Sequence, residues 1–518
     1  MSATSESGAE QTKRLCIDLL RSQDIPQHVV RPPEALLTAP VRVLQFGTGR
    51  FLRAFTDWML QRASAQDVLH ARAAVVQSTP AGAYDKLVCQ DGLFTVVERG
   101  ISDGGLREAF EIVGSIASAI DASTQWPAVL DLAADPQVNV VVSNTTEVGI
   151  KTSPDDALDA APPRSYPAKL TAWLWRRFQT LGNAPESALL VLPCELVDNN
   201  GDLLRSAVEE LAVRWELPTE FLQWLNGRVS FCNTLVDRIV TGFPPTDELA
   251  DIEARLGYRD DLLDVCEPYH LWAIQADPEA AEMFPLDQAG LNVVFTSNVV
   301  PYRDRKVRLL NGSHSLMSPA ACLAGCTYVR DTMNHPTLSL WVRRLLFEEL
   351  VPSLPYPRAE LNEYAESVLR RFSNPYVRHR HEDILVNTAV KLRTRVVPSI
   401  LSHAARTGQP PRLVAFGYAA WIALLLESKE RAEVLTFSGP CGMVSVRDPL
   451  AVELRRRLGD ASGREGVSSA VRSLLADRSV WDADLCAVPG FVDEVAGTAF
   501  DIRLRGVETV LSELLGVR

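Results

Sequence analysis

Short apolar runs separated by helical patterns occupy the first part of the chain. The first run covers residues 41–46, and helical spacing of apolar residues follows it through residue 60. Further strand-like runs lie at residues 71–77, 93–98, 139–143, 188–193, 229–234 and 236–240. Strands that alternate with helices are typical of βαβ units. The pattern up to about residue 297 therefore predicts a doubly wound, mostly parallel sheet.

A glycine turn, Gly47-Thr48-Gly49, directly follows the first run. A strand, a Gly-x-Gly turn and a helix together bring backbone N–H groups against the pyrophosphate of a dinucleotide. Leu52 stands where the usual third glycine would be, so the turn alone is equally compatible with a plain strand-to-helix connection. After the second run, residues 77–79 read Gln-Ser-Thr where an acidic residue usually binds the ribose. The choice between NAD and NADP therefore stays open.

The pattern changes near residue 300. Beyond it, apolar residues recur at helical spacing in residues 338–350, 361–372, 383–401, 412–427, 447–458, 465–476 and 501–516. We therefore predict an α/β, doubly wound, Rossmann-like domain followed by a mostly α-helical domain. The expected divisions are an N-terminal extension at residues 1–36, a dinucleotide-binding domain at residues 37–297 and a helical substrate and catalytic domain at residues 298–518.

The net charge of −13 argues against nucleic-acid or anionic-membrane partners, because a negative protein repels polyanions. No signal peptide opens the chain and no run of about 18 apolar residues occurs, so we expect a cytoplasmic protein. The nine cysteines are scattered, which fits reduced thiols. Cys322 and Cys326, one helical turn apart, are better interpreted as core thiols than as a metal or redox site.

Polar residues gather at three places that could carry chemistry. Lys306, Asn311 and His314 lie at the head of an apolar segment. In an α-helix, Asn311 would lie roughly 140° and His314 roughly 80° around the axis from Lys306, so all three could reach one cleft. A lysine beside other cations can exchange a proton near neutral pH, and an amide can donate to a developing oxyanion. On spacing alone, surface charges and a core histidine explain the segment at least as well.

A basic cluster, residues 370–381, includes Arg378 and His379 and is followed by Lys391. In an acidic chain such a cluster could bind the carboxylate of a sugar acid, or it could be a solvated loop. A polar cluster, residues 143–147, ends the fourth strand-like run and contains Asn144 and Thr145. The carboxyl ends of strands bind ligands in open α/β sheets, although a capped loop is an equal alternative.

Four segments together resemble the mannitol dehydrogenase family of polyol-specific long-chain dehydrogenases. They are residues 45–55 (QFGTGRFLRAF), 143–147 (SNTTE), 236–239 (VDRI) and 306–314 (KVRLLNGSH). Residues 193–196 and 391–398 favour a branch that acts on sugar acids, and the match covers about residues 38–510. Members acting on mannitol carry an arginine where this chain has Asp383, which disfavours a neutral hexitol.

The resemblance implies a metal-independent, NAD(H)-dependent enzyme that interconverts D-tagaturonate and D-altronate. It implies that Lys306 is the general acid/base, that Asn311 and Asn200 polarise the substrate oxygen, and that His314 positions the substrate. Asn199 is the alternative to Asn200. Substrate-binding candidates are Asp237, Lys391, Arg378 and His379. Cofactor-binding candidates are Phe46, Gly47, Gly49, Phe51, Asn144 and Thr145.

Other activities are compatible with the same residues. Within the family these are fructuronate reduction and mannitol or arabinitol 2-dehydrogenation. From another class, an epimerase that retains NAD would use the same proton-transfer groups. A nucleotide-sensing protein is the least favoured alternative, because it would have no use for Lys306 and Asn311. The expected partner is a small sugar acid, and the oligomeric state is not predicted.

Overall fold

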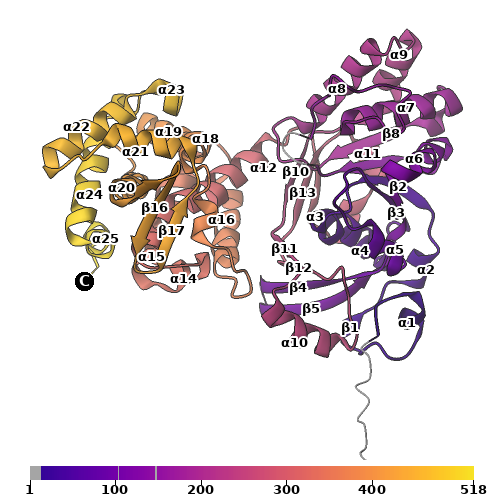
Figure 1. Ribbon diagram of the computed structural model, residues 1–518, viewed down its shortest axis with the longest axis horizontal. Coiled ribbons are helices and arrows are strands. Elements are labelled where there is room, and N and C mark those ends of the chain that lie inside the picture. The colour runs from indigo at the N-terminus through magenta and orange to yellow at the C-terminus, as the bar shows by residue number, and fades with distance from the viewer. Residues whose placement is uncertain (1–12, 103, 146–148, 518) are drawn as a thin grey trace, which may run out of the picture. The chain divides into compact units, whose positions relative to one another are not determined.

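The computed structural model describes residues 13–102, 104–145 and 149–517. It divides into two compact units, Met1–Val299 and Val300–Arg518 (Figure 1). Within the described residues, no helix combines the length and the hydropathy that crossing a membrane requires.

Unit 1 is built on a six-stranded parallel sheet. In spatial order its strands are β6 (Ile116–Asp121), β3 (Arg72–Gln77), β2 (Val41–Phe46), β7 (Val140–Ser143), β8 (Leu189–Pro193) and β9 (Val229–Phe231). Chain order reverses between β2 and β7, which is the topological switch point of a doubly wound sheet. The predicted α/β fold is therefore confirmed.

Helices cover both faces of this sheet (Figure 1). One face packs Leu44, Phe46, Val141 and Trp173 into a core, and the other packs Val43, Val75, Phe55 and Met59. The helices of unit 1 are α1 (Ile17–Arg21), α2 (Glu34–Leu37), α3 (Arg50–Leu52), α4 (Trp58–Ala65), α5 (Tyr84–Cys89), α6 (Ala122–Asp131), α7 (Tyr166–Leu181), α8 (Asn200–Arg214), α9 (Thr219–Arg228), α10 (Thr246–Leu256) and α11 (Pro278–Met283). The strands are thus buried on both sides, as their continuous apolar runs require.

Two further sheets complete unit 1, and the sequence pattern did not separate them from the first. One has the order β1 (Val29–Val30), β5 (Gly105–Val113), β4 (Phe94–Ser102), β12 (Asp264–Cys266) and β11 (Val240–Gly242). The other has the order β10 (Thr234–Asp237), β13 (Leu271–Gln275) and β14 (Val293–Thr296). The run at 93–98 therefore belongs to an antiparallel hairpin, β4–β5, and not to the parallel sheet.

The segment expected as an N-terminal extension is partly built into unit 1. Residues 1–12 lie outside the described part of the chain, whereas Leu15, Leu19 and Leu20 are buried against Phe110 and Val265. Strand β1 pairs in parallel with β5. Apolar side chains ahead of Pro26, together with strand β1, therefore anchor residues 13–37 to the unit.

Unit 2 is mostly helical, as predicted. Its helices are α12 (Val300–Arg305), α13 (Gly312–Leu323), α14 (Val329–Asn334), α15 (Pro336–Arg344), α16 (Arg358–Phe372), α17 (His381–Ile384), α18 (Thr388–Arg395), α19 (Val397–Thr407), α20 (Arg412–Glu427), α21 (Pro449–Leu458), α22 (Gly463–Leu475), α23 (Arg478–Trp481), α24 (Phe491–Arg505) and α25 (Val507–Leu515). A small antiparallel sheet, which the sequence did not predict, comprises β15 (Lys429–Arg431), β16 (Val434–Gly439) and β17 (Gly442–Val446).

Helix α20 is the centre of unit 2. Every residue from Leu413 to Leu426 is buried, and a helix that is apolar on all sides must be surrounded. At Gly417, a Cβ atom would lie 2.7 Å from the Cδ2 atom of Leu316. Glycine at this position therefore allows α13, the helix that begins just after Lys306, to pack closely on α20.

Candidate functional site

The glycine turn lies at the switch point and borders a cavity of about 660 Å³. Gly47 has φ +130°, and its N–H donates to the carbonyl oxygen of Val76 at 3.0 Å. A Cβ atom on Gly47 would lie 3.3 Å from the Cδ1 atom of Leu52 and 3.4 Å from the oxygen of Asn144. Leu52, which replaces the third glycine, therefore packs directly under the turn.

Buried polar side chains donate hydrogen bonds to the carbonyl groups of the turn. The Arg53 guanidinium donates to the Thr48 carbonyl at 2.8 Å and pairs with Asp264 at 3.3 Å. The Gln45 amide donates to the Gly47 carbonyl and to the Asp57 carboxylate, each at 3.1 Å. These bonds engage the carbonyl groups of Gly47 and Thr48, and the turn lines the cavity just ahead of the N-terminus of α3.

Of the six predicted cofactor residues, five line the cavity: Phe46, Gly47, Gly49, Asn144 and Thr145. Phe51 does not line it; its ring stacks on Phe55 with centroids 4.9 Å apart. The Asn144 amide donates to the Cys194 carbonyl at 3.0 Å. The polar cluster after β7 is therefore a built wall of the cavity, although its residues Thr146 and Glu147 lie outside the described part of the chain.

Glu195 supports that wall. Its buried carboxylate accepts hydrogen bonds from the Thr145 N–H at 2.9 Å, the Thr145 hydroxyl at 3.0 Å and the Ser143 hydroxyl at 3.1 Å. Burial raises the pKa of Glu195, and these hydrogen bonds oppose the shift. Glu195 thus orders the strand end without facing the cavity.

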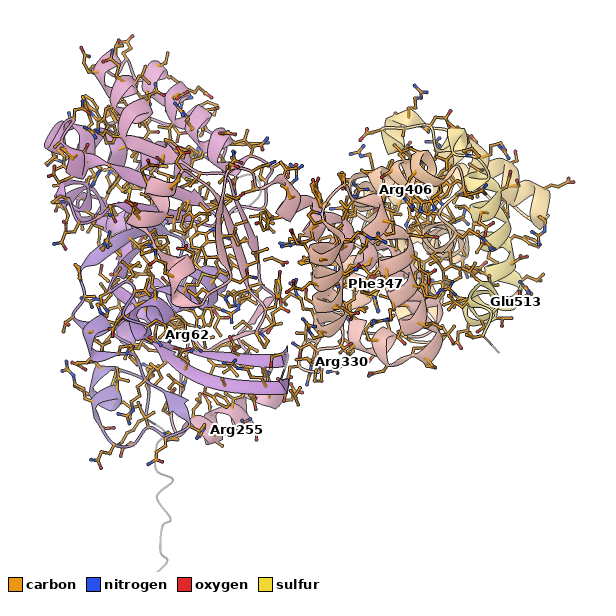
Figure 2. The ribbon with its side chains drawn as sticks, turned by 180° about the vertical axis from the view of Figure 1, so that it is seen from behind. Arg62, Arg255, Arg330, Phe347, Arg406 and Glu513 are labelled. Atoms are coloured by element: carbon orange, nitrogen blue, oxygen red, sulfur yellow. The ribbon has the colours of Figure 1, made fainter. Side chains whose placement is uncertain are left out.

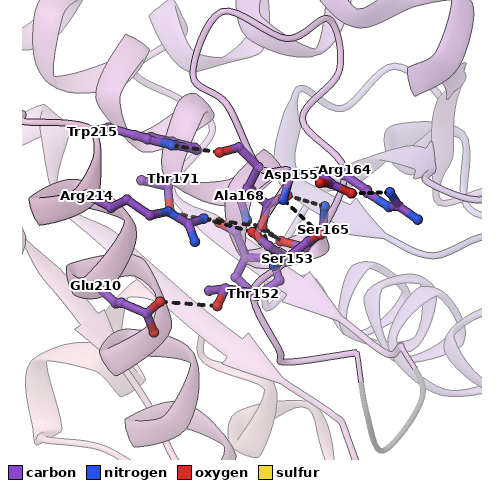
Figure 3. A network of polar contacts seen from close by, with 12 residues as sticks. Thr152, Ser153, Asp155, Arg164, Ser165, Ala168, Thr171, Glu210, Arg214 and Trp215 are labelled. Atoms are coloured by element: carbon purple, nitrogen blue, oxygen red, sulfur yellow. Dashed lines mark hydrogen bonds and ion pairs between the residues drawn. The ribbon is translucent and has the colours of Figure 1, made fainter.

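A third wall, which the sequence did not predict, comes from the loop before α7 and from α7 itself. It contributes Lys151, Ser153, Arg164, Ser165, Tyr166 and Lys169. Asp156 organises this loop by accepting hydrogen bonds from the Ser153 N–H, the Ser165 N–H and the Ser165 hydroxyl at 2.6–2.7 Å, in the network of Figure 3. The only sequence signal was Ser165, which caps α7, beside a basic residue.

Asn200, the first residue of α8, and Asp237, the last residue of β10, are both buried. The Asn200 amide nitrogen donates to the carbonyls of Pro193 at 2.9 Å, Glu195 at 3.1 Å and Thr234 at 3.2 Å. The Asn200 side chain therefore ties two strand ends together. Asn199, by contrast, is exposed, in the left-handed conformation, at the N-terminus of α8.

In unit 2, Lys306–Asn311 forms a π-helix (η5) and not the α-helix assumed from the sequence. The N–H of Gly312 donates to the carbonyl of Val307, five residues earlier. Residues five apart in a π-helix lie on one face, as do residues three apart in an α-helix. Lys306, Asn311 and His314 therefore follow one stripe, and the separations expected for an α-helix are wrong.

The cations around Lys306 have partners of their own. Arg303 pairs with Asp304 at 3.1 Å, and the Arg305 guanidinium lies 4.6 Å from the Tyr364 ring centroid. Arg308 donates to the hydroxyls of Ser399 at 2.9 Å and Ser353 at 3.1 Å. Among the described residues, the Asn311 amide has no hydrogen-bond partner. Its donor group is therefore available to a ligand.

His314 is buried in a cationic environment. Its ring stacks on Phe372 with centroids 4.2 Å apart and meets the edge of His379 at 5.1 Å. Burial lowers the pKa of His314 well below its usual value, and His379, His381 and Arg371 lower it further. Its Nε2 atom has no hydrogen-bond partner among the residues described. A neutral imidazole with a free ring nitrogen suits a hydroxyl ligand.

Three of the predicted substrate-binding residues, Lys391, Arg378 and His379, belong to unit 2, whereas Asp237 belongs to unit 1. Lys391 is half-buried, and its ammonium donates to the Ile384 carbonyl at 2.9 Å. His379 contacts His314, whereas Arg378 beside it is exposed. Arg395, which donates to the Ser315 hydroxyl at 3.2 Å, adds a further cation near the stripe.

All nine cysteines are free, and burial raises the pKa of Cys326 to about 11. Within the described ranges, no three His, Cys, Asp or Glu side chains lie close enough together to hold a metal ion.

Asp57 beneath the glycine turn gives a prediction about pH. Burial raises its pKa from 3.8 to about 7. Between these values the folded protein retains a proton that the unfolded chain has lost, so the free energy of unfolding falls as pH rises. Asp57→Asn keeps the neutral form at every pH. We expect it to remove up to about 1.4 kcal/mol per pH unit of that slope.

Urea unfolding of wild type and Asp57→Asn at pH 4.5–7.5 measures this slope. Asp67→Asn, an exposed aspartate in the same unit, is the control and should retain the wild-type slope. Parallel pH profiles for wild type and Asp57→Asn would contradict the prediction.

A doubly wound sheet with a glycine turn at its switch point, joined to a helical unit, defines the class of two-domain dehydrogenases that bind a dinucleotide. Two family models match the chain: the mannitol dehydrogenase Rossmann domain over residues 41–288 and the mannitol dehydrogenase C-terminal domain over residues 298–502. The chain therefore belongs to the mannitol dehydrogenase family, as the sequence motifs predicted.

Relatives and solved structures agree with this assignment. The chain is 38% identical over 480 residues to altronate oxidoreductase of Halalkalibacterium halodurans, covering 92% of this chain and 93% of the relative. It is 37% identical over 477 residues to altronate oxidoreductase of Shigella flexneri, covering 92% and 97%. The structure of Pseudomonas fluorescens mannitol 2-dehydrogenase, a ternary complex with NAD and D-mannitol, matches with a TM-score of 0.70 and 25% identity over 97% of this chain and 99% of that chain.

Proposed function

We propose that this chain is an NAD(H)-dependent oxidoreductase that interconverts D-tagaturonate and D-altronate. The observation that carries the substrate is the similarity to altronate oxidoreductases over 92% of the chain. The observation that supports the cofactor is the cavity at the switch point, whose glycine turn and helix N-terminus suit a pyrophosphate. When bound, NAD(H) supplies or accepts the hydride.

The residues of this chain then have to protonate and stabilise one oxygen atom, the carbonyl oxygen of the substrate. During reduction, the carbonyl oxygen gains negative charge and must receive a proton. Lys306 is proposed to give that proton through its ammonium, and to take it back from the hydroxyl in the oxidation direction. The free Asn311 amide is proposed to donate to the same oxygen as its charge grows.

Asn200, the second amide proposed for this oxygen, already has hydrogen-bond partners in the structure. Its nitrogen carries two hydrogens, and the carbonyls of Pro193, Glu195 and Thr234 accept from them. To donate to substrate, Asn200 must release one of these carbonyls. We therefore assign the main oxyanion role to Asn311 and keep Asn200 as a proposed second donor.

The remaining roles concern the rest of the sugar acid. His314 is proposed to accept a substrate hydroxyl at its unpartnered Nε2 atom. Lys391, Arg378 and His379 are proposed to bind substrate, and the positive charge of this region suits a carboxylate. Asp237 is proposed to contact substrate from the end of β10. We place the enzyme in the cytoplasm, which its nine free cysteines support.

A substrate panel tests the proposal. Purified protein is mixed with NADH and with D-tagaturonate, D-fructuronate or D-fructose, and the loss of NADH absorbance is followed. We expect the largest kcat/KM for D-tagaturonate. Fastest turnover of D-fructuronate or D-fructose would move the chain to another activity of the family. Conversion of substrate with no net change in NADH would favour an epimerase.

A further inference from the structure

The strand end that meets the adenosine ribose in a doubly wound sheet is chemically unusual in this chain. In the usual arrangement, a carboxylate after the second strand accepts hydrogen bonds from the ribose diol, and it also repels a phosphate on the 2′ oxygen. Here that strand is β3, and it ends at Gln77. Ser78 and Thr79 follow, and all three residues line the cavity.

The Gln77 side chain is fixed with its donor side free. Its Oε1 atom accepts from the N–H of Tyr84 at 3.0 Å, which leaves the NH2 group as the available end. Gly82 packs against this amide, because a Cβ atom there would lie only 2.1 Å from Oε1. The strand end therefore offers a neutral donor where a carboxylate would offer two charged acceptors.

Ser78 provides a second unused group. Its Oγ atom is buried and has no hydrogen-bond partner within the described residues. A buried hydroxyl without a partner loses about 1–3 kcal/mol relative to a bonded one, which makes it a natural ligand contact. Thr79, in contrast, is already engaged, because its hydroxyl donates to the Ala81 carbonyl at 2.8 Å.

The described lining of the cavity is also positively charged, which favours a phosphate group. Its described lining contains the cations Arg53, Lys151, Arg164 and Lys169, and no aspartate or glutamate is among those lining residues. Arg53 and Arg164 pair with carboxylates outside the lining. Lys151 is exposed and forms no ion pair with any described residue. In a protein of net charge −13, this cavity is a locally positive site.

We propose that the cavity accepts dinucleotides with a 2′-phosphate, NADP(H), as well as NAD(H), with Gln77 and Ser78 as the specificity-determining residues. This inference rests on the proposed function only in that the cavity binds a dinucleotide. The donors at Gln77 and Ser78 serve either a ribose hydroxyl or a phosphate oxygen. No described carboxylate in the lining excludes the second phosphate, and Lys151 adds long-range attraction.

Binding titrations of the whole chain test the inference. NADH and NADPH are titrated separately into wild-type protein, and Kd is obtained from nicotinamide fluorescence without any sugar substrate. We expect the two Kd values to lie within about tenfold of each other. Adenosine 2′,5′-bisphosphate should likewise bind at least as tightly as AMP by calorimetry.

Gln77→Glu supplies the missing carboxylate with almost no change in shape. It should weaken NADPH binding by about 30-fold or more, because the new charge faces the 2′-phosphate. NADH should bind equally well or more tightly, since a carboxylate can accept from the ribose diol. Gln179→Glu, which adds the same charge at an exposed position of α7, is the matched control and should leave the NADPH to NADH ratio of Kd values unchanged.

Each outcome decides the question. If wild type binds NADH but binds NADPH over a hundredfold more weakly, the inference is overturned while the proposed function stands. If Gln77→Glu and Gln179→Glu change the ratio equally, Gln77 is not the determinant and the inference is overturned. If neither dinucleotide binds, both the inference and the proposed function fail.

Discussion

Replacing Lys306 by alanine is expected to lower kcat for D-tagaturonate reduction by about a thousandfold, with a much smaller change in KM. The reason is that no other described side chain on the Lys306–Asn311–His314 stripe can supply a proton at neutral pH. The Asn311 amide does not titrate, and burial keeps His314 neutral by lowering its pKa. Steady-state kinetics at saturating NADH measure the change.

Three measurements make the Lys306 prediction specific. Lys429→Ala, an exposed lysine of β15 in the same unit, should retain wild-type kcat. NADH titration should give the same Kd for Lys306→Ala as for wild type, which separates proton transfer from cofactor binding. A primary amine added to the Lys306→Ala reaction should restore part of the rate. Retention of more than about a tenth of kcat by Lys306→Ala would exclude a general acid/base role.

Replacing Arg238 by methionine is expected to destabilise the protein by about 3–5 kcal/mol. The Arg238 guanidinium is fully buried, pairs with Glu98 at 2.8 Å and lies 4.1 Å from the Trp58 ring centroid. It also donates to the carbonyls of Ala54 at 2.6 Å and Glu267 at 3.0 Å. Methionine fills part of the space but leaves the Oε2 atom of Glu98 and two carbonyls without their donor, while Arg107 still pairs with Oε1 at 3.1 Å.

Chemical unfolding followed by tryptophan fluorescence measures this loss. Arg255→Met is the matched control, because Arg255 also pairs with a glutamate, Glu108, at 2.7 Å and lies 4.6 Å from the Phe110 ring centroid. Its side chain is 40% exposed, so water can replace the lost contacts and the cost should stay below about 1 kcal/mol. Equal costs for the two substitutions would show that burial is not what makes the Arg238 pair matter.

The parallel sheet could be predicted because each of its strands is a continuous apolar run and because the Gly-x-Gly turn follows the first run directly. Strand β4 could not be assigned to its sheet in the same way. Its partners, β5 and β12, are an adjacent hairpin strand and a segment about 170 residues away, and apolar content alone does not choose between partners. The small β15–β17 sheet escaped prediction because its strands are short, and β15 is exposed along its whole length.

The part of the candidate site that could be predicted consists of residues that directly follow a strand in the sequence. Gly47, Gly49, Asn144 and Thr145 follow strands directly, so their place at the sheet edge follows from the sequence. The wall around Lys169 was missed because hydrogen bonds to Asp156, and not a sequence motif, bring that loop to the cavity. The resemblance to a known family named the Lys306 segment, but it carried no information about the winding of the helix there.

The π-helical winding of Lys306–Asn311 decides which face of the helix carries each side chain. A π-turn is equivalent to an α-helix that contains one additional residue. In an α-helix a spacing of five would leave the lysine and the amide about 140° apart, and the π-turn removes most of that separation. The local winding of this helix, and not the residue spacing alone, thus places Lys306 and Asn311 on one face.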